Sequence, residues 1–407
     1  MNSNGQKVVV LGVSSSIAAY KAANLTSILR KRNYDVHVIM TENATKFISP
    51  VVFETLTNNP CVVKQFERTG KYEVDHVALA KIADVVLVAP ATANVLAKFA
   101  HGIADDALST QMLACTCPKI VAPAMNTNMY LNPITQENLK LLAKYGFTVI
   151  TPASGMLACR DVGIGKFPDE NLIADYVDRE IAAVHDFAGR KVLVTAGATQ
   201  ESIDPVRFIT NHSTGKMGYA LATEFMLRGA EVTLVAAPNS LNDIPFIDIV
   251  HVKSAADMFE AVASKAYTQD VIIKAAAVAD YTPLTYSDDK IKKKDGDLSV
   301  PLKRTTDILS YLGAHKRPGQ ILCGFSMETK DLIENSSEKL VKKNADMIIA
   351  NNLKVEGAGF GVETNVVTII TSDVDGSVKT IQLPIMSKAD VAKNIADCIS
   401  GKLTQLD

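Results

Sequence analysis

The feature that most constrains this chain is a repeated alternation of short apolar runs with amphipathic stretches. In the first half, strand-like runs lie at residues 8–13, 35–40, 84–90, 119–125 and 147–150. Runs this rich in Val and Ile are typical of strands that are buried on both faces of a parallel sheet. The stretches between them have helical spacing, as in residues 17–33 and 134–146. We therefore predict an α/β, doubly wound fold.

The alternation restarts near residue 190, and 407 residues are enough for two domains. A strand at 191–197 and a helix at 217–230 begin the second series, followed by strands at 231–237, 247–252, 270–277, 320–325 and 346–352. Residues 359–383 are typical of an antiparallel hairpin around a Gly-containing turn, and a last helix is expected at about 387–401. The predicted domains are 1–189 and 190–407.

Composition excludes several classes of protein. With 47% apolar residues, 21% charged residues and a net charge of -2, the chain lacks the basic surface that nucleic-acid binding needs. Its first residues enter a strand without a signal peptide, and the sequence has no apolar run that predicts a membrane span. A cytoplasmic location is expected. The six cysteines lack CxxC spacing, which favours free thiols, with Cys115 and Cys117 structural.

Ligands of open α/β sheets bind beyond the carboxyl ends of the strands. The first such loop holds Gly12, Ser14, Ser15 and Ser16 before a helix, which suits one phosphate. A serine N-cap alone explains most loops of this kind. The loop lacks GxGxxG, which argues against a dinucleotide.

Four loops at one sheet edge together favour a flavin over a simple helix cap. The candidate cofactor contacts beyond the first loop are Thr41, Pro90, Thr92, Asn94 and Ser109. The motif PAMNTNM adds Asn126, whose amide can hold a carboxylate, and Met129, which can pack against a flat ring.

In the second half, NHSTGKMG at 211–218 raises the question of a Walker loop. Thr210 stands where a Walker loop needs its first Gly, and Met217 stands where it needs Ser or Thr. The stretch is therefore not a Walker loop. Residues 282–305 are polar and charged without a helical stripe, so they are expected to form an exposed flap.

The motifs GVSSSIAAYK, HVALAKIADVVLVAPATAN, PAMNTNM and GMLACRDVGIGK resemble the flavin-containing cysteine decarboxylases. Together with VTAGATQESIDPVRFITNHSTGKMG, KAAAVADY, KIKK and GFSMET, the whole chain is similar to the family of bacterial bifunctional coenzyme A biosynthesis proteins. These fuse a phosphopantothenoylcysteine decarboxylase to a phosphopantothenate-cysteine ligase. The resemblance implies a flavodoxin-like flavoprotein domain followed by a Rossmann-like ligase domain.

For the first domain, the resemblance implies FMN-dependent oxidative decarboxylation. FMN oxidises the thiol of phosphopantothenoylcysteine to a thioaldehyde, which gives the electrons of the departing carboxylate a place to go. Asn126 is then expected to hold the substrate carboxylate, His76 to act as the base, and Cys159 to return a proton. A lone His beside a strand is otherwise more often structural, and a single Cys is usually a core residue.

For the second domain, the resemblance implies that CTP activates 4'-phosphopantothenate as an acyl-cytidylate, which the amine of cysteine then attacks. Asn211 is expected near the acyl-cytidylate, with residues 213–218 near phosphates. Lys290 in the flap is expected to stabilise the charged transition state, although a charge run is usually a solvated face. The remaining nucleotide positions are Asp280, Thr306, Asp307, Ile308, Leu309, Phe325, Lys339 and Lys343. Mg²⁺ is expected with the triphosphate, with ligands that the sequence does not reveal.

Three further alternatives stay open at this point. Arg207 is a candidate substrate contact, and a surface salt bridge explains it equally well. The first domain is alternatively an FMN-binding regulatory module without turnover, which the presence of His76, Asn126 and Cys159 disfavours. An NAD(P)-dependent oxidoreductase is disfavoured because neither first loop has GxGxxG. The resemblance also implies a homo-oligomer, a dodecamer, with small-molecule substrates.

Overall fold

The computed structural model describes residues 5–65, 75–156, 162–182, 184–292, 298–328, 332–352, 362–372 and 378–406. The chain divides into two compact units, Met1–Ala182 and Ala183–Asp407, which are described separately. No helix in the described part of the chain is long and apolar enough to cross a membrane.

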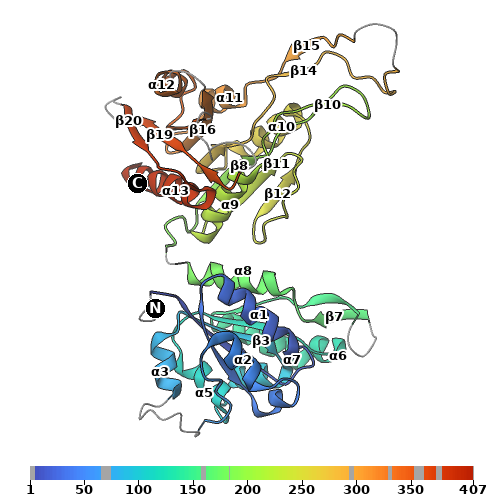
Figure 1. The fold of residues 1–407 in the computed structure, drawn as a ribbon, viewed down its shortest axis with the longest axis vertical. Helices are drawn as coiled ribbons and strands as arrows, with labels where there is room; N and C mark the ends of the chain where they lie inside the picture. Colours follow the sequence, from blue (N-terminus) through green and yellow to red (C-terminus); the bar gives the residue numbers. More distant parts are fainter. Residues whose placement is uncertain are drawn as a thin grey trace. The chain divides into compact units, whose positions relative to one another are not determined.

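The first unit is built on a five-stranded parallel sheet with the order β2-β1-β3-β4-β5 (Figure 1). Its strands are β1 (Val8–Val13), β2 (Asp35–Met40), β3 (Val85–Ala91), β4 (Lys119–Pro123) and β5 (Phe147–Val149). This order is that of flavodoxin-like folds, so the predicted fold class is confirmed. The sequence placed β1 and β2 at their observed bounds, and the other three strands within two residues.

Helices cover both faces of this sheet. They are α1 (Ala19–Lys31), α2 (Pro50–Thr57), α3 (Asp75–Ile82), α4 (Ala93–His101), α5 (Ala107–Ala114), α6 (Thr127–Leu131), α7 (Pro133–Lys144), α8 (Glu170–Ile181) and the short 3-10 helix η1 (Glu42–Lys46). Because side chains alternate along a strand, Leu11 of β1 packs with α1 and α8 on one face, whereas Val10 packs with α4 and α5 on the other. Both strand faces are therefore apolar, as the sequence pattern predicts.

A short antiparallel hairpin, β6 (Ala153–Met156) and β7 (Val162–Lys166), was not predicted as strands. Its glycines carry too little side chain for a strand pattern, and they allow a close backbone approach. The Met125 N–H donates to the Gly165 carbonyl at 3.0 Å. A Cβ at Gly165, whose φ is +129°, would lie 2.3 Å from the Met125 carbonyl oxygen. Cys159 lies outside the described residues of this hairpin.

The second unit contains an eight-stranded sheet with the order β12-β11-β8-β13-β16-β17-β19-β20. Its strands are β8 (Lys191–Ala196), β11 (Glu231–Ala236), β12 (Asp248–His251), β13 (Val271–Lys274), β16 (Ile321–Glu328), β17 (Met347–Asn352), β19 (Val367–Ser372) and β20 (Val378–Gln382). The first six strands are parallel, and β19 and β20 complete the edge as an antiparallel pair. The predicted C-terminal hairpin is confirmed.

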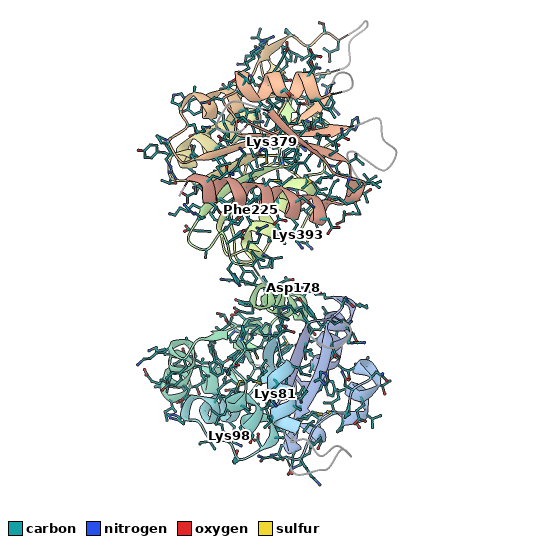
Figure 2. The ribbon with its side chains drawn as sticks, turned by 90° about the vertical axis from the view of Figure 1, so that its left-hand side faces the viewer. Lys81, Lys98, Asp178, Phe225, Lys379 and Lys393 are labelled. Atoms are coloured by element: carbon teal, nitrogen blue, oxygen red, sulfur yellow. The ribbon has the colours of Figure 1, made fainter. Side chains whose placement is uncertain are left out.

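Helices cover both faces of the second sheet as well. They are α9 (Lys216–Leu227), α10 (Ala255–Ala266), α11 (Ile308–Ala314), α12 (Leu332–Lys342) and α13 (Lys388–Leu406). Phe225 of α9, labelled in Figure 2, meets Phe187 edge to face with ring centroids 4.7 Å apart. Helix α13 continues five residues beyond the predicted end at Gly401, because Leu403 still packs into the same core as α9.

Three two-stranded pairs complete the second unit. They are β9 (Glu201–Ser202) with β10 (Phe208–Ile209), β14 (Tyr281–Pro283) with β15 (Leu302–Arg304), and β18 (Thr364–Asn365) with β21 (Met386–Ser387). The β14–β15 pair projects away from the eight-stranded sheet in Figure 1. It lies within the segment predicted as a flap.

Candidate functional site

The first candidate site is a cavity of about 640 Å³ in the N-terminal unit. The predicted cofactor residues Ser15, Thr41 and Asn94 line it. They come from the segments that follow β1, β2 and β3, so the topology gathers them at one sheet edge. This is the edge at which the sequence predicts a ligand.

Ser14 joins two of these loops. Its hydroxyl donates to the Pro90 carbonyl at 2.8 Å, and the Thr92 N–H donates to the same hydroxyl at 3.0 Å. The side chain is fully buried. Ser14 and Thr92 therefore join the loop after β1 to the loop after β3, whereas their neighbours Ser15 and Asn94 line the cavity. Ser16 makes a local turn, because its hydroxyl accepts from the Ala18 N–H at 3.2 Å.

The hydroxyl of Thr41 is the strongest sign of a ligand at this cavity. Its oxygen is buried and has no hydrogen-bond partner among the described residues. A buried polar atom without a partner is costly and calls for an explanation, for which an absent ligand is one of the standard ones. A ligand with a hydrogen-bonding group facing Thr41 fits this cavity.

A charged cluster at the same cavity was missed by the sequence analysis. The ammonium of Lys98, labelled in Figure 2, lies 2.6 Å from Asp105 and 2.8 Å from Asp106. Burial alone would lower the pKa of Lys98, but these hydrogen bonds raise it above its usual value. The only signal in the sequence was the pair of acidic residues after Gly102, which a helix start explains equally well.

Two predicted cofactor residues have clear structural roles in this unit. A Cβ at Gly12 would lie 2.5 Å from the Leu108 side chain, so glycine lets α5 pack against β1. Ser109 forms a capping box with Asp106 at the start of α5, where its hydroxyl donates to that carboxylate at 2.8 Å. Ser109 does not line the 640 Å³ cavity. It stays a prediction that Gly12 and Ser109 contact the cofactor.

The predicted decarboxylase residues are described only in part. Asn126 caps α6, where its side-chain oxygen accepts from the Asn128 N–H at 2.9 Å. Met129 on the same helix is 49% exposed, which leaves its side chain free to meet a ligand. His76 lies in the first turn of α3, and its side chain is outside the described part of the structure, as is all of Cys159.

The second candidate site is a cavity of about 390 Å³ in the C-terminal unit, at the carboxyl ends of β13, β16 and β17 and the start of α9. The residues 213–218 of NHSTGKMG line it. So do the predicted positions Asp280, Thr306, Asp307, Ile308, Leu309, Phe325, Lys339 and Lys343. The structure therefore brings together segments that are more than 100 residues apart in the sequence.

Two of the predicted lysines already have protein partners. The Lys343 ammonium lies 2.6 Å from both Asp307 and the Ser310 hydroxyl. Partial burial would raise the pKa of Asp307, but the hydrogen bonds from Lys343 and the Ser310 N–H lower it below its usual value. Lys339 donates to the Phe325 carbonyl at 3.3 Å. Both lysines face the cavity from α12 or its C-terminal end, as their four-residue spacing predicts.

Asn211 lies behind the wall of this cavity. Its amide nitrogen donates to the Ala277 carbonyl at 3.0 Å, and its amide oxygen accepts from the Ser213 N–H at 3.0 Å. Ala277 and Ser213 both line the cavity. Asn211 thus connects the loop before α9 to the loop after β13.

Arg207 forms an ion pair with Asp204, as one of its two sequence interpretations predicts. Its Nε lies 3.0 Å from the Asp204 carboxylate, and its Nη2 donates to the Ile291 carbonyl at 2.9 Å. The same carboxylate accepts from the Ile291 N–H at 3.1 Å. Arg207 and Asp204 therefore both bond to the main chain of Ile291, the residue after Lys290. The side chain of Lys290 itself is exposed. Neither Arg207 nor Lys290 lines the 390 Å³ cavity.

Lys274 is one of several lining residues of the second cavity that were not predicted from the sequence. Lys274 ends β13, within the motif KAAAVADY that the sequence analysis quoted for its family resemblance alone. Burial and, to a lesser extent, the positive charge of Lys339 lower the pKa of its ammonium to about 8, and the carboxylates of Asp307 and Asp280 oppose this shift. A lysine ending an apolar strand was the signal that could have found it.

Comparisons with known proteins assign both units. The flavoprotein family model matches residues 1–182, and that of the DNA/pantothenate metabolism flavoprotein C-terminal domain matches residues 187–403. The coenzyme A biosynthesis bifunctional protein CoaBC of Bacillus subtilis (strain 168) is 46% identical over 396 residues, 97% of this chain and 96% of that protein. The chain belongs to the CoaBC family.

Other CoaBC proteins match over a similar length. The CoaBC protein of Borreliella burgdorferi is 42% identical over 96% of this chain and 98% of its own length. A crystal structure of the C-terminal domain of a CoaBC protein is 42% identical, covers 54% of this chain and 99% of that chain, and superposes with a TM-score of 0.46. The identity to the two full-length CoaBC proteins confirms the resemblance read from the sequence.

Proposed function

We propose that this chain carries out two consecutive steps of coenzyme A biosynthesis. Its membership of the CoaBC family makes it a bifunctional enzyme, with a decarboxylase flavoprotein domain and a ligase domain. In the proposed order, the ligase joins cysteine to 4'-phosphopantothenate, and the decarboxylase converts that product to 4'-phosphopantetheine. The observation that carries the proposal is the match to bifunctional relatives along 97% of the chain.

The ligase step is proposed to use CTP in the 390 Å³ cavity. A carboxylate oxygen of 4'-phosphopantothenate attacks the α-phosphorus of CTP, and pyrophosphate leaves. The amine of cysteine then attacks the acyl carbon, loses a proton and expels CMP, which leaves an amide. The lysines that line the cavity suit a triphosphate, because cations lower the energy of the negative charge on the reacting phosphorus centre. The positions that the sequence predicts at the nucleotide are proposed to bind CTP here; they are Asp280, Thr306, Asp307, Ile308, Leu309, Phe325, Lys339 and Lys343.

The flap is proposed to bring Lys290 to the reacting phosphate. This proposal is supported by the hydrogen bonds of Asp204 and Arg207 to the main chain of Ile291, the next residue. Because these bonds fix the main chain beside Lys290, they restrict the positions that the flap can take when it closes. Asn211 is proposed to set the spacing between the phosphate loop and the Ala277 loop, and so to orient the acyl-cytidylate. Mg²⁺ is proposed to enter with the triphosphate; among the described residues, no group of three or more His, Cys, Asp or Glu side chains is arranged to hold a metal ion.

The decarboxylase step is proposed to use FMN at the 640 Å³ cavity. Bound FMN supplies a reversible two-electron oxidation of the cysteine-derived thiol. Thr41, Ser15 and Asn94 are proposed to hold the cofactor, which the unpartnered Thr41 hydroxyl supports. Asn126 is proposed to hold the substrate carboxylate, His76 to take the proton lost on oxidation, and Cys159 to return one after CO₂ has left. A homo-oligomer, specifically a dodecamer, is proposed from the family resemblance.

Two half-reactions test the two activities separately. Pyrophosphate release that needs both CTP and 4'-phosphopantothenate, but no cysteine, is the expected sign of acyl-cytidylate formation. Release of CO₂ from synthetic phosphopantothenoylcysteine, without CTP, is the expected sign of the decarboxylase. FMN-loaded protein that releases no CO₂ would contradict the second half and favour a regulatory flavin-binding role.

A further inference from the structure

Lys274 occupies a central position at the floor of the ligase cavity. It is the last residue of β13, where it lies opposite Thr195 of β8 on one side and Gly324 of β16 on the other. The preceding residues of the strand, Ile272 and Ile273, are buried on opposite faces of the sheet. Lys274 is therefore the one charged residue of an otherwise apolar strand, and it lines the cavity.

The ammonium of Lys274 differs from the other ammonium groups at this cavity because it has no acceptor among the residues that the structure describes. Lys343 lies on Asp307 at 2.6 Å, and Lys339 donates to the Phe325 carbonyl at 3.3 Å. Lys216 pairs with Glu363 at 2.5 Å, and Lys388 donates to the Val362 carbonyl at 2.5 Å. Within the described part of the chain, Lys274 makes no hydrogen bond and no ion pair.

The charges around Lys274 do not neutralise it. Lys339 on α12 faces it with a second positive charge, while Asp307 before α11 and Asp280 after β13 are the carboxylates that act on it. One of these carboxylates, Asp307, is already bound to Lys343. A half-buried cation that no described carboxylate contacts directly is unfavourable unless a ligand supplies the negative charge.

We propose that Lys274 binds a phosphate group of the nucleoside triphosphate in the ligase cavity, as a substrate-binding residue additional to Lys339 and Lys343. This inference rests on the proposed ligase function. It is carried by the position of Lys274 at the end of β13 in the cavity lining and by the lack of an acceptor for its ammonium in the described part of the chain. Lys339 and Lys343 also bond to Phe325 and Asp307 in the walls of the cavity, whereas Lys274 has no such bond to the described residues.

The test is calorimetric titration of the full-length protein with CTP and Mg²⁺. Lys274→Met is expected to weaken CTP binding about 10-fold to 100-fold, the cost of losing one hydrogen bond between charged groups. Lys274→Arg is expected to retain most of the affinity because it keeps the charge. Lys342→Met is the matched control, since Lys342 is an exposed lysine of the same α12 that carries Lys339. Unchanged thermal unfolding of each variant shows that it folds.

Proton uptake on CTP binding is a second measurement. It would not depend on Lys274 if that residue had only a structural role. The free ammonium has a pKa of about 8, and a bound phosphate would raise it, so the wild type is expected to take up protons when CTP binds near pH 8. Neither Lys274→Met nor Lys274→Arg should show this uptake. Equal CTP affinity and equal proton uptake in wild type and Lys274→Met would overturn the inference. A wild type that does not bind CTP would instead contradict the proposed ligase.

Discussion

The side-chain amide of Asn211 donates a hydrogen bond to the main-chain carbonyl of Ala277 at 3.0 Å. This contact ties the loop before α9 to the loop after β13, which are two walls of the same cavity. Replacement of Asn211 by Ala is expected to reduce CTP-dependent pyrophosphate release by about 10-fold, because one partly buried hydrogen bond orients both loops. Decarboxylation of phosphopantothenoylcysteine by the same variant is the internal control. If both activities fell together, Asn211 would matter for folding and not for the ligase cavity.

The ion pair between Asp204 and Arg207 predicts how the flap is held. Asp204→Asn keeps the size of the side chain but removes the charge that binds Arg207 and the Ile291 N–H. We expect a lower ligase kcat, with little change in the KM for cysteine, and faster amide hydrogen exchange in residues 284–292. Unchanged exchange in these residues together with a lower kcat would show that Asp204 does not act through the flap.

The same carboxylate predicts a pH dependence of stability. The hydrogen bond from Arg207, with those from the Val206 and Ile291 N–H groups, holds the pKa of Asp204 below its usual range. A carboxyl group whose pKa is lowered by folding stabilises the protein above its unfolded pKa of about 3.9, and this contribution is lost as the pH falls below that value. In urea unfolding, the difference between wild type and Asp204→Asn should therefore be largest near neutral pH and shrink towards pH 3. A difference that is constant with pH would contradict this assignment.

The unpartnered hydroxyl of Thr41 predicts an effect on cofactor binding alone. Thr41→Val removes an oxygen that has no partner among the described residues, so the apoprotein should be no less stable than the wild type. FMN binding, followed by quenching of flavin fluorescence, should weaken about 10-fold if the hydroxyl meets the cofactor. Ser14→Ala is the matched control, since it breaks bonds to Pro90 and Thr92 and should lower apoprotein stability. FMN binding that Thr41→Val leaves intact would place the cofactor elsewhere.

The close contact at Gly165 predicts that a larger residue there destabilises the β6–β7 hairpin. An added Cβ would lie 2.3 Å from the Met125 carbonyl oxygen at a φ of +129°, so Gly165→Ala combines a clash with backbone strain. We expect a loss of about 1–3 kcal/mol in the unfolding free energy of the N-terminal unit, and a large loss of decarboxylase activity because Asn126 follows Met125. Gly401→Ala, where a Cβ meets nothing within 4 Å, is the control. Full decarboxylase activity in Gly165→Ala would show that this contact does not support Asn126.

The sequence predicted the central strands well and the site geometry less well, for physical reasons. Val8–Val13 is apolar and buried throughout, and Val36 and Val38–Met40 are the buried part of the second strand, a pattern that is typical of strands in a parallel sheet. The β6–β7 hairpin was missed because its glycines leave no alternating pattern. Asp204 was missed because its role depends on Ile291, 87 residues away. Lys274 was missed because the lack of an acceptor is visible only when the cavity around it is known.

The most direct test of the central claim is mass spectrometry of the products formed by the full-length, FMN-loaded protein with 4'-phosphopantothenate, cysteine, CTP and Mg²⁺. We expect 4'-phosphopantetheine together with CMP and pyrophosphate. Accumulation of phosphopantothenoylcysteine would limit the chain to its ligase activity. The absence of both products would contradict the proposal that this chain performs the two steps.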